Sequence, residues 1–279
     1  MKNKSKFEVK IIFKKRCTAC PHNCDLADNE VGLCNARKNI NGKVKAINYG
    51  RLTVMSLDPV SKYIVNNGFH DAKILSIGSY GCNMRCLSCG SPSIAKATSE
   101  KAKTRLVRPD DLTEVAYSLK PKGNIGVAFT HNEPLIAYEY VRDCAKTLHK
   151  RGMKSIVMTN GFISLQALEE IMPWTDAISV TLDGFSSLNY EKQNINIERI
   201  KNFIKKSCES LYTEIEVRLP QNSNESAEEI ETFARWVASI DKNIYIGIKM
   251  KNAEGIEREK IDTIRVALEK YLKNTIIKK

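Results

Sequence analysis

Three closely spaced cysteines, Cys82, Cys86 and Cys89, follow the short apolar run at residues 74–79. A short run of this kind predicts a buried strand, so the cysteines belong to the tight loop that begins where the strand ends. Three thiolates in one loop can hold a four-iron four-sulfur (4Fe-4S) cluster and leave one iron with an open coordination position, which would be a reaction site. The alternatives are a structural zinc site completed by a distant histidine, and thiols that hold no metal.

From residue 73 onward, short β-branched runs alternate with longer stretches of helical apolar spacing. This alternation predicts βα units around a parallel sheet, which right-handed connections would curve into a partial (β/α)6 barrel of the α/β class. In such a barrel, the chemistry belongs at the carboxyl ends of the strands. Strands are expected at residues 74–79, 125–130, 155–159, 177–182, 214–219 and 244–250, and helices at residues 109–119, 135–150, 165–172, 195–210 and 226–239.

A second set of cysteines, Cys17, Cys20, Cys24 and Cys34, predicts a small metal-binding module near the N-terminus. Four thiolates at these spacings can wrap either a zinc ion or an iron-sulfur cluster. His22 could replace one of the thiolates. Closed ligation by four thiolates favours a structural or electron-relaying role over catalysis.

These features divide the chain of 279 residues into three parts. Residues 1–72 form the cysteine-rich module and its lead-in, and residues 73–250 form the barrel. Residues 251–279 contain an amphipathic stretch that predicts a C-terminal packing helix. The length agrees with one main domain, since α/β barrels of roughly 200 to 250 residues are common.

The chain carries 44 lysine and arginine residues against 32 aspartate and glutamate residues, a formal net charge of +12. This excess favours acidic partners, such as an acidic protein substrate or a nucleic acid, but identifies none of them. No RNA-binding motif is present, and no stretch approaches the roughly 20 apolar residues of a membrane span. Clustered cysteines without a secretory signal indicate metal ligation in a reducing compartment. We therefore expect a soluble cytoplasmic protein.

The C-x3-C-x2-C spacing of the loop cysteines resembles the signature of the radical S-adenosylmethionine (radical SAM) enzymes, whose unique iron binds the amino acid end of that cofactor. The segment Thr130–Pro134 resembles the T-Y-N-E-P segment of activating enzymes of the pyruvate formate-lyase type. That resemblance implies that Asn132 and Glu133 hold the cofactor amino group. The T-N-G that begins at Thr159 is also similar to the family, which implies a cofactor contact for Thr159 or Asn160, although Asn-Gly after a strand is a common turn.

Other positions depart from the family pattern. Thr181 and Asp183 stand where relatives usually carry D-x-K, which reverses the charge at Asp183. Ser88 replaces an aromatic residue that lies near the adenine in the family. Arg218, at the end of the fifth predicted strand, could pair with the cofactor carboxylate, or with Asp183 or Glu216. Ser88, Asp183 and Arg218 complete the candidate cofactor-binding residues.

The N-terminal C-x2-C-P-H-x-C segment resembles the opening of a radical SAM group in the AmmeMemoRadiSam system. The combined resemblance implies reductive cleavage of S-adenosylmethionine to a 5'-deoxyadenosyl radical, which abstracts hydrogen from a protein, as in glycyl-radical activation, or from a small molecule. It also implies a reductant such as flavodoxin or ferredoxin. Two alternatives are a degenerate member that serves as a scaffold or electron-transfer protein, and an RNA-modifying radical SAM enzyme.

Overall fold

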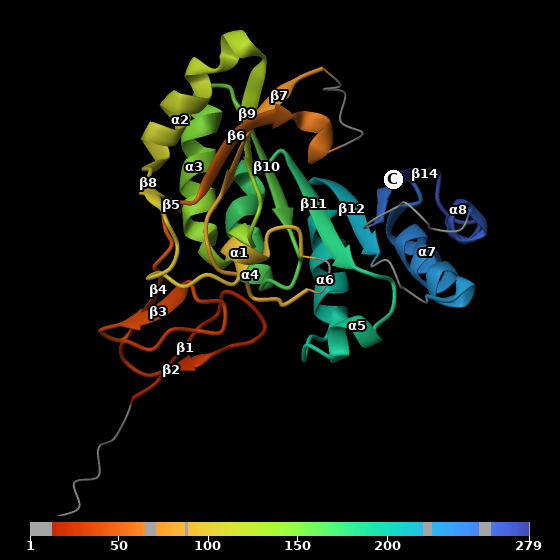
Figure 1. Ribbon diagram of the computed structural model, residues 1–279, viewed down its shortest axis with the longest axis horizontal. Helices are drawn as coiled ribbons and strands as arrows, with labels where there is room; N and C mark the ends of the chain where they lie inside the picture. The colour runs from red at the N-terminus through yellow and green to blue at the C-terminus, as the bar shows by residue number, and fades with distance from the viewer. Residues whose placement is uncertain (1–12, 65–70, 87–88, 220–224, 251–257, 279) are drawn as a thin grey trace, which may run out of the picture.

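The computed structural model describes residues 13–64, 71–86, 89–219, 225–250 and 258–278 (Figure 1). One eight-stranded sheet occupies the centre, in the order β14-β13-β12-β11-β10-β9-β7-β6. Its neighbouring strands run parallel, except that β6 pairs antiparallel with β7. The strands are β6 (Val54–Pro59), β7 (Lys73–Gly78), β9 (Asn124–Phe129), β10 (Lys154–Thr159), β11 (Ala177–Asp183), β12 (Tyr212–Leu219), β13 (Tyr245–Met250) and β14 (Asn274–Lys278). The predicted α/β fold of the partial-barrel type is confirmed.

The sheet is wider than the six predicted strands by one strand at each edge. Strand β6 pairs with β7 over its full length, from Val54 opposite Gly78 to Pro59 opposite Lys73. Strand β14 adds a parallel edge beside β13. The predicted C-terminal helix corresponds to α8 (Arg258–Glu269), which β14 follows, while residues 251–257 lie outside the described part of the chain. Both edge strands receive their partner from a distant segment, which local apolar periodicity does not report.

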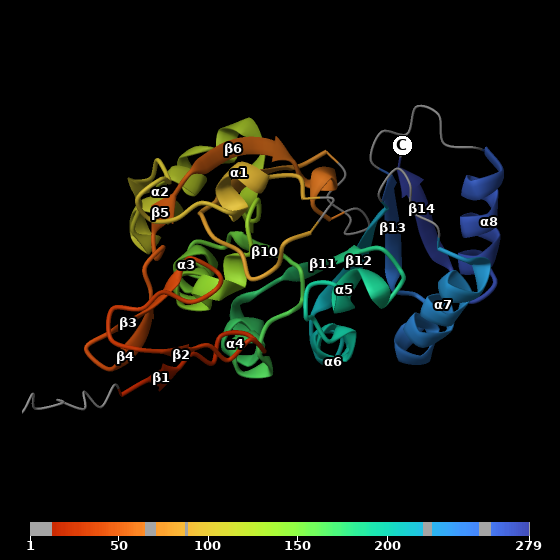
Figure 2. The same cartoon turned by 60° about the horizontal axis from the view of Figure 1, so that its bottom comes forward.

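Helices follow the strands in the order expected of βα units. Figure 2 shows α3, α4, α6 and α7 one after another along one side of the curved sheet. None of the helices in the described ranges is long and apolar enough to cross a membrane. The helices are α1 (Pro92–Ala95), α2 (Pro109–Ser118), α3 (Tyr138–Lys150), α4 (Leu165–Ile171), α5 (Leu188–Glu191), α6 (Ile197–Ser207), α7 (Ala227–Asp241) and α8, and short 3-10 turns include η1 (Val60–Lys62) and η3 (Pro134–Ala137).

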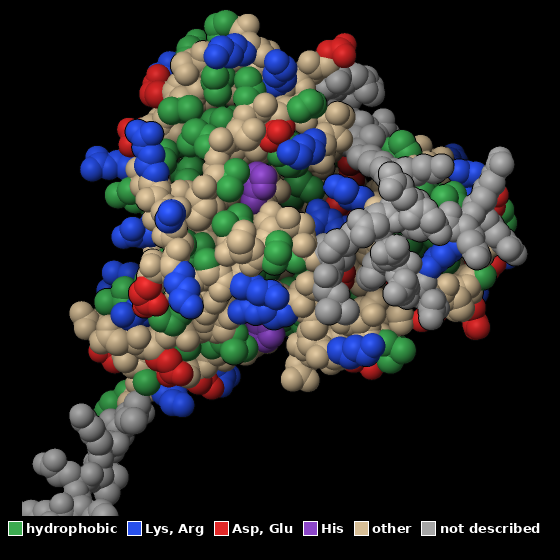
Figure 3. Space-filling view, viewed as in Figure 1, with side chains coloured by type: hydrophobic (Ala, Val, Ile, Leu, Met, Phe, Trp, Pro, Cys, Tyr) green, Lys and Arg blue, Asp and Glu red, His purple; other side chains and the backbone are tan. Residues whose placement is uncertain are grey.

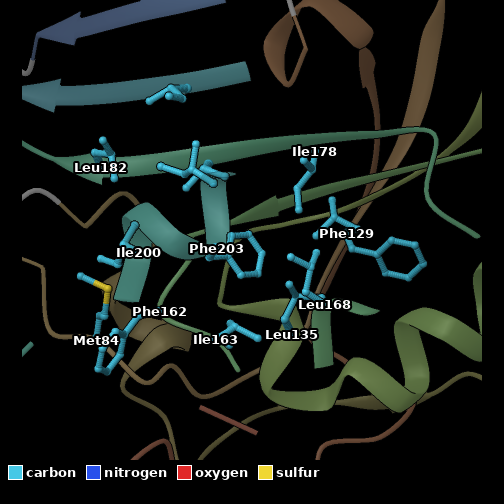
Figure 4. Packing of buried hydrophobic residues seen from close by; sticks show 14 of the residues in the cluster. Met84, Phe129, Leu135, Phe162, Ile163, Leu168, Ile178, Leu182, Ile200 and Phe203 are labelled. Atoms are coloured by element: carbon cyan, nitrogen blue, oxygen red, sulfur yellow. The ribbon is translucent and has the colours of Figure 1, made fainter. Parts of the chain in front are cut away.

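The core lies between the sheet and these helices. Helix α6 shows why it forms, because Ile200, Phe203 and Ile204 are buried at helical spacing and face the sheet. In Figure 4, Phe203 and Ile178 of β11 belong to one apolar layer with Phe129 of β9. Each such side chain contributes about 1.5 to 3 kcal/mol when fully buried. This layer holds the strand ends in fixed positions for the site above them.

The N-terminal cysteines belong to a small unit, called here the cysteine module, at residues 15–46. It contains two antiparallel pairs: β1 (Lys15–Arg16) with β2 (Asp25–Leu26), and β3 (Arg37–Ile40) with β4 (Lys43–Ala46). The nearly buried side chain of Arg37 donates to both carboxylate oxygens of Glu139 on α3, at 2.7 and 2.8 Å. This ion pair fastens the module to the barrel.

A partly buried carboxylate joins the edge strand β6 to the rest of the sheet. Asp58 accepts hydrogen bonds from the hydroxyls of Ser76 and Tyr63, each at 2.6 Å, and from the Lys62 ammonium at 3.1 Å. Burial alone would raise the pKa of Asp58, but these three hydrogen bonds outweigh it and lower the pKa to about 2. The charged form therefore stabilises the fold.

We expect Asp58→Asn to lower the free energy of unfolding by about 2 kcal/mol near neutral pH, because charge-assisted hydrogen bonds are lost. The folded-state pKa lies below the unfolded value of 3.8, so this contribution is complete above that value and disappears as the pH falls toward about 2. Urea denaturation of both proteins across this range measures the difference. A difference that stayed constant with pH would contradict the assignment to the ionised carboxylate.

Candidate functional site

A cavity of about 360 Å³ opens at the carboxyl ends of the parallel strands. The loop that follows β7 contributes Cys82, Cys86 and Cys89 to its wall, so the structure gathers all three predicted ligands at one cavity. Gly90, Ser91 and Ala95 follow the last cysteine on the same wall. The remaining wall residues come from the ends of β9 to β13 and from η1; they are Lys62, Tyr63, Thr130, His131, Asn132, Glu133, Met158, Thr159, Asn160, Thr181, Leu182, Asp183, Glu216, Arg218 and Lys249. The strand ends therefore meet the cysteine loop around one open cavity.

The cysteine-bearing loop, called here the cluster loop, comprises the described residues 79–86 and 89–91. Cys82, Cys86 and Cys89 are free thiols and partly buried. Burial raises the pKa of Cys82 to about 12 and also raises that of Cys86, while a backbone N–H donated by Met84 to the Cys82 sulfur acts in the opposite direction. A bound metal favours the thiolate over the thiol and offsets such a burial cost. Within the described ranges, no group of three or more His, Cys, Asp or Glu side chains converges to hold a single metal ion, whereas a 4Fe-4S cluster is larger and takes each thiolate on a different iron.

Glu133 is the most deeply buried charged group on the cavity wall, with 2% of its surface exposed. Its carboxylate accepts from the Thr159 hydroxyl at 2.9 and 3.0 Å, from the Asn160 N–H at 2.7 Å and from the Leu135 N–H at 2.9 Å. Burial nevertheless raises the pKa of Glu133 to about 7. The three donors make four contacts, two at each carboxylate oxygen, which matches the roughly four acceptor positions that a carboxylate offers.

Asn132 braces the start of the cluster loop. Its side-chain oxygen accepts from the Ser79 N–H at 2.9 Å, and its amide nitrogen donates to the Gly81 carbonyl at 3.0 Å. The Asn132 side chain is thus committed to the backbone just before Cys82. The structure assigns it a positioning contact in addition to its place on the cavity wall.

Asn160 connects the end of β10 to the cluster loop. Its amide nitrogen donates to the side-chain oxygen of Asn83 at 2.8 Å and lies 3.8 Å from the Cys82 sulfur. Its side-chain oxygen accepts from the Phe162 N–H at 2.9 Å, which closes the turn of the T-N-G segment. The structure therefore brings Thr159, Asn160 and Glu133 together beside Cys82.

Asp183 and Arg218 occupy adjacent strands on the opposite wall and are paired in register. Asp183 is buried, and its negative charge contributes to the raised pKa of Cys86. The Arg218 Nε donates to Glu216 at 2.8 Å, and its guanidinium lies beside Gly90, which follows the last loop cysteine. Of the partners that the sequence left open for Arg218, the structure thus shows Glu216. Ser88 lies outside the described residues.

Sequence reasoning missed the wall on the β6 side. Lys62 and Tyr63 reach the cavity from η1, which no motif marks. His131 adopts a φ of 69°, a conformation that costs about 1 to 3 kcal/mol for a residue other than glycine. A Cβ at Gly78 would lie 2.7 Å from the His131 Cβ, so the absence of a side chain at residue 78 permits this close packing. The glycine at the end of β7, Gly78, is the sequence feature that could have indicated close packing at this point of the wall.

Comparison with known proteins agrees with this arrangement. The description "Radical SAM superfamily" matches residues 76–237, which run from β7 into α7. The chain belongs to the radical SAM superfamily. Membership implies a 4Fe-4S cluster and S-adenosylmethionine, and the site fits both: three thiols share a cavity wall, and the volume of about 360 Å³ lies within the range of about 300 to 1,000 Å³ found for small-ligand pockets.

Two sequence relatives extend this picture of the radical SAM chain. The uncharacterized protein MJ0808 of Methanocaldococcus jannaschii is 30% identical over 171 residues, which cover 61% of this chain and 50% of that protein. This chain thus spans half the length of that relative. A pyruvate formate-lyase-activating enzyme of Clostridium pasteurianum is 23% identical over 220 residues, which cover 70% of this chain and 88% of the enzyme.

Among solved structures, Streptococcus suis SuiB is similar with a TM-score of 0.51 at 14% identity. The similarity covers 72% of this chain and 48% of SuiB. It shows a shared fold and nothing more specific.

We expect Glu133→Gln to lower the free energy of unfolding by about 1 to 3 kcal/mol, because the amide nitrogen of glutamine would face a buried donor. Urea denaturation of the metal-free protein measures this loss. Glu114→Gln is the matched control, since Glu114 pairs with Arg151 at the surface and an exposed pair contributes at most about 1 kcal/mol. Equal effects of the two substitutions would contradict the role of Glu133 as a buried acceptor.

Proposed function

We propose that this radical SAM chain binds a 4Fe-4S cluster through Cys82, Cys86 and Cys89 and cleaves S-adenosylmethionine reductively. The observation that carries this proposal is the meeting of three segments at one point: Asn160 reaches Cys82 and Asn83 while its N–H binds Glu133. Segments that match the family motifs separately thereby form one continuous wall. When bound, the cluster and the cofactor supply a 5'-deoxyadenosyl radical for hydrogen abstraction.

The residues of the wall supply complementary charges for a zwitterionic cofactor. An ammonium group beside Glu133 would keep the buried carboxylate ionised through its positive charge. Arg218 lies on the cavity wall with its Nε held by Glu216, and its guanidinium is the group we assign to a carboxylate of the cofactor. Thr159 and Asn160 orient Glu133, and Asp183 lies near Cys86 on the opposite wall.

For the substrate, we propose hydrogen abstraction of the glycyl-radical-activating type from a protein, with a small molecule as the alternative. The similarity to the activating enzyme of Clostridium pasteurianum and the N-terminal resemblance to the AmmeMemoRadiSam group support this choice. The electron would come from a one-electron carrier such as flavodoxin or ferredoxin. Figure 3 shows basic side chains spread over one face rather than gathered in one patch, which suits weak attraction of an acidic protein partner.

The test is to incubate the reconstituted, dithionite-reduced protein with S-adenosylmethionine and to measure 5'-deoxyadenosine and methionine. We expect both products from the wild type and background amounts from Cys86→Ala, because a cluster ligand is missing. Cys208→Ser is the control, since Cys208 lies at the end of α6, away from the cavity wall. An intact cluster without 5'-deoxyadenosine would refute the proposal and favour the degenerate scaffold.

A second prediction concerns the cofactor carboxylate. We expect Arg218→Met to weaken binding of S-adenosylmethionine about tenfold while leaving the iron content unchanged, because one charge-assisted hydrogen bond is lost. Equilibrium binding to the oxidised, cluster-loaded protein measures this change without turnover. Unaltered affinity would show that Arg218 serves Glu216 alone.

A further inference from the structure

The cysteine module contacts the cluster loop directly, although the two are far apart in the sequence. The Cys82 N–H donates to the Cys34 carbonyl at 3.1 Å, so a ligand candidate of one set is hydrogen-bonded to a ligand candidate of the other. Arg85, within the loop, donates to the Leu33 carbonyl at 2.9 Å. The module therefore holds the cluster loop through two backbone carbonyls, those of Leu33 and Cys34.

The contact is tight enough to require glycine. Gly81 has a φ of 87°, and a Cβ there would lie 2.4 Å from the Cys34 carbonyl oxygen and 2.9 Å from the Ala36 Cβ. Real Cβ atoms do not approach other atoms so closely, so a side chain at residue 81 would push the module and the loop apart. The two segments are built as one packed unit.

A second bridge runs through His22, the residue that the sequence offered as a possible metal ligand. The ring Nε2–H of His22 donates to the Asn83 carbonyl at 2.9 Å, and its ring packs edge-on against Phe162 at 5.1 Å. Asn83 is buried and donates to the Phe162 carbonyl at 2.5 Å. Beside it, the Ser164 N–H donates to the Ala19 carbonyl at 3.1 Å. His22 thus joins the module to the cluster loop and to the turn after β10.

The four module cysteines have the chemical features of metal ligands, although no three of them converge on a single metal ion in the described part of the chain. Cys17, Cys20, Cys24 and Cys34 are all free thiols, and Cys24 alone among them is more than slightly exposed. The backbone N–H of His22 donates to the Cys20 sulfur, and that of Ala36 donates to the Cys34 sulfur. Met84 donates to the Cys82 sulfur in the same way. Such N–H groups favour a thiolate, which is the form that zinc and iron-sulfur clusters bind.

We propose that Cys17, Cys20, Cys24 and Cys34 form a separate site for a thiophilic metal centre, and that this site clamps the cluster loop through Cys34 and His22. The inference rests on the proposed placement of the cluster on Cys82, Cys86 and Cys89. A metal bound by the four module thiolates would restrain the backbone of residues 17–34, which includes His22, Leu33 and Cys34. The cluster loop then opens less often, and its iron is retained longer.

The first experiment establishes the metal. A variant with alanine at Cys82, Cys86 and Cys89 leaves the module cysteines alone, and it is reconstituted anaerobically with zinc in one arm and with iron and sulfide in another. We expect about one zinc ion per chain, or about four irons with matching sulfide, and the arm that retains metal after desalting identifies the centre. A variant that retains neither would overturn the metal site.

The second experiment tests the clamp by the rate at which a chelator removes iron from the cluster loop. Cys24→Ser removes a module ligand, and His22→Ala removes a bridge while keeping all four thiols. We expect both to release cluster-loop iron about fivefold faster than the wild type, the size of one lost hydrogen bond. Cys208→Ser, the matched cysteine control, should release it at the wild-type rate. In the wild-type reference, the module is loaded with zinc, so that all released iron comes from the cluster loop.

Iron release at the wild-type rate from both variants would overturn the clamp. Far-ultraviolet circular dichroism checks their fold, and if Cys24→Ser does not fold, His22→Ala carries the test. Restored retention in His22→Gln, whose amide can still donate to the Asn83 carbonyl, would support the bridge. These readouts do not depend on 5'-deoxyadenosine, so an enzyme that failed to cleave its cofactor would still support or overturn the clamp.

Discussion

The buried Glu133 carboxylate is the interaction on which the arrangement of the site depends. It binds the hydroxyl of Thr159 and the N–H of Asn160, so the ends of β9 and β10 are joined by polar contacts where the apolar core stops. Asn160 is then aimed at Asn83 and Cys82. Because hydrogen bonds are directional while apolar packing is not, this network sets the position of the cluster loop more narrowly than the core below it does.

The burial of this site also makes negative charge on its side chains unfavourable. The pKa values of Cys82 and Glu133 are both raised, mainly by burial, which means that the protein surroundings disfavour their charged forms. Asp183 adds further negative charge near Cys86. The positive charge of Arg218 offsets part of this negative charge, but its guanidinium is also hydrogen-bonded to Glu216. The site is therefore matched to ligands that bring positive charge, as an iron centre and an ammonium group do.

Much of this organisation could be predicted from the sequence, and the exceptions have physical causes. All six predicted strands exist because their apolar runs are continuous and bounded by turns. Strands β6 and β14 escaped prediction because their partners, not their own periodicity, make them strands. The motif residues Glu133 and Asn160 were found by resemblance, whereas Asn83 and His22 act through long-range contacts, such as those at 2.8 and 2.9 Å, that no local pattern encodes.

The close approach at Gly81 bears on how such proteins can be recombined. Since the backbone of residue 81 rests against Cys34 and Ala36, the surfaces of the module and the barrel are shaped for each other at the level of single atoms. A cysteine module transplanted from a relative would have to reproduce the carbonyl position of Cys34, or the graft would displace the loop it is meant to support. The N-terminal segment is thus not interchangeable between relatives. Chimeras joined between residues 46 and 73 would pair the Gly81 backbone with a module whose surface does not fit it.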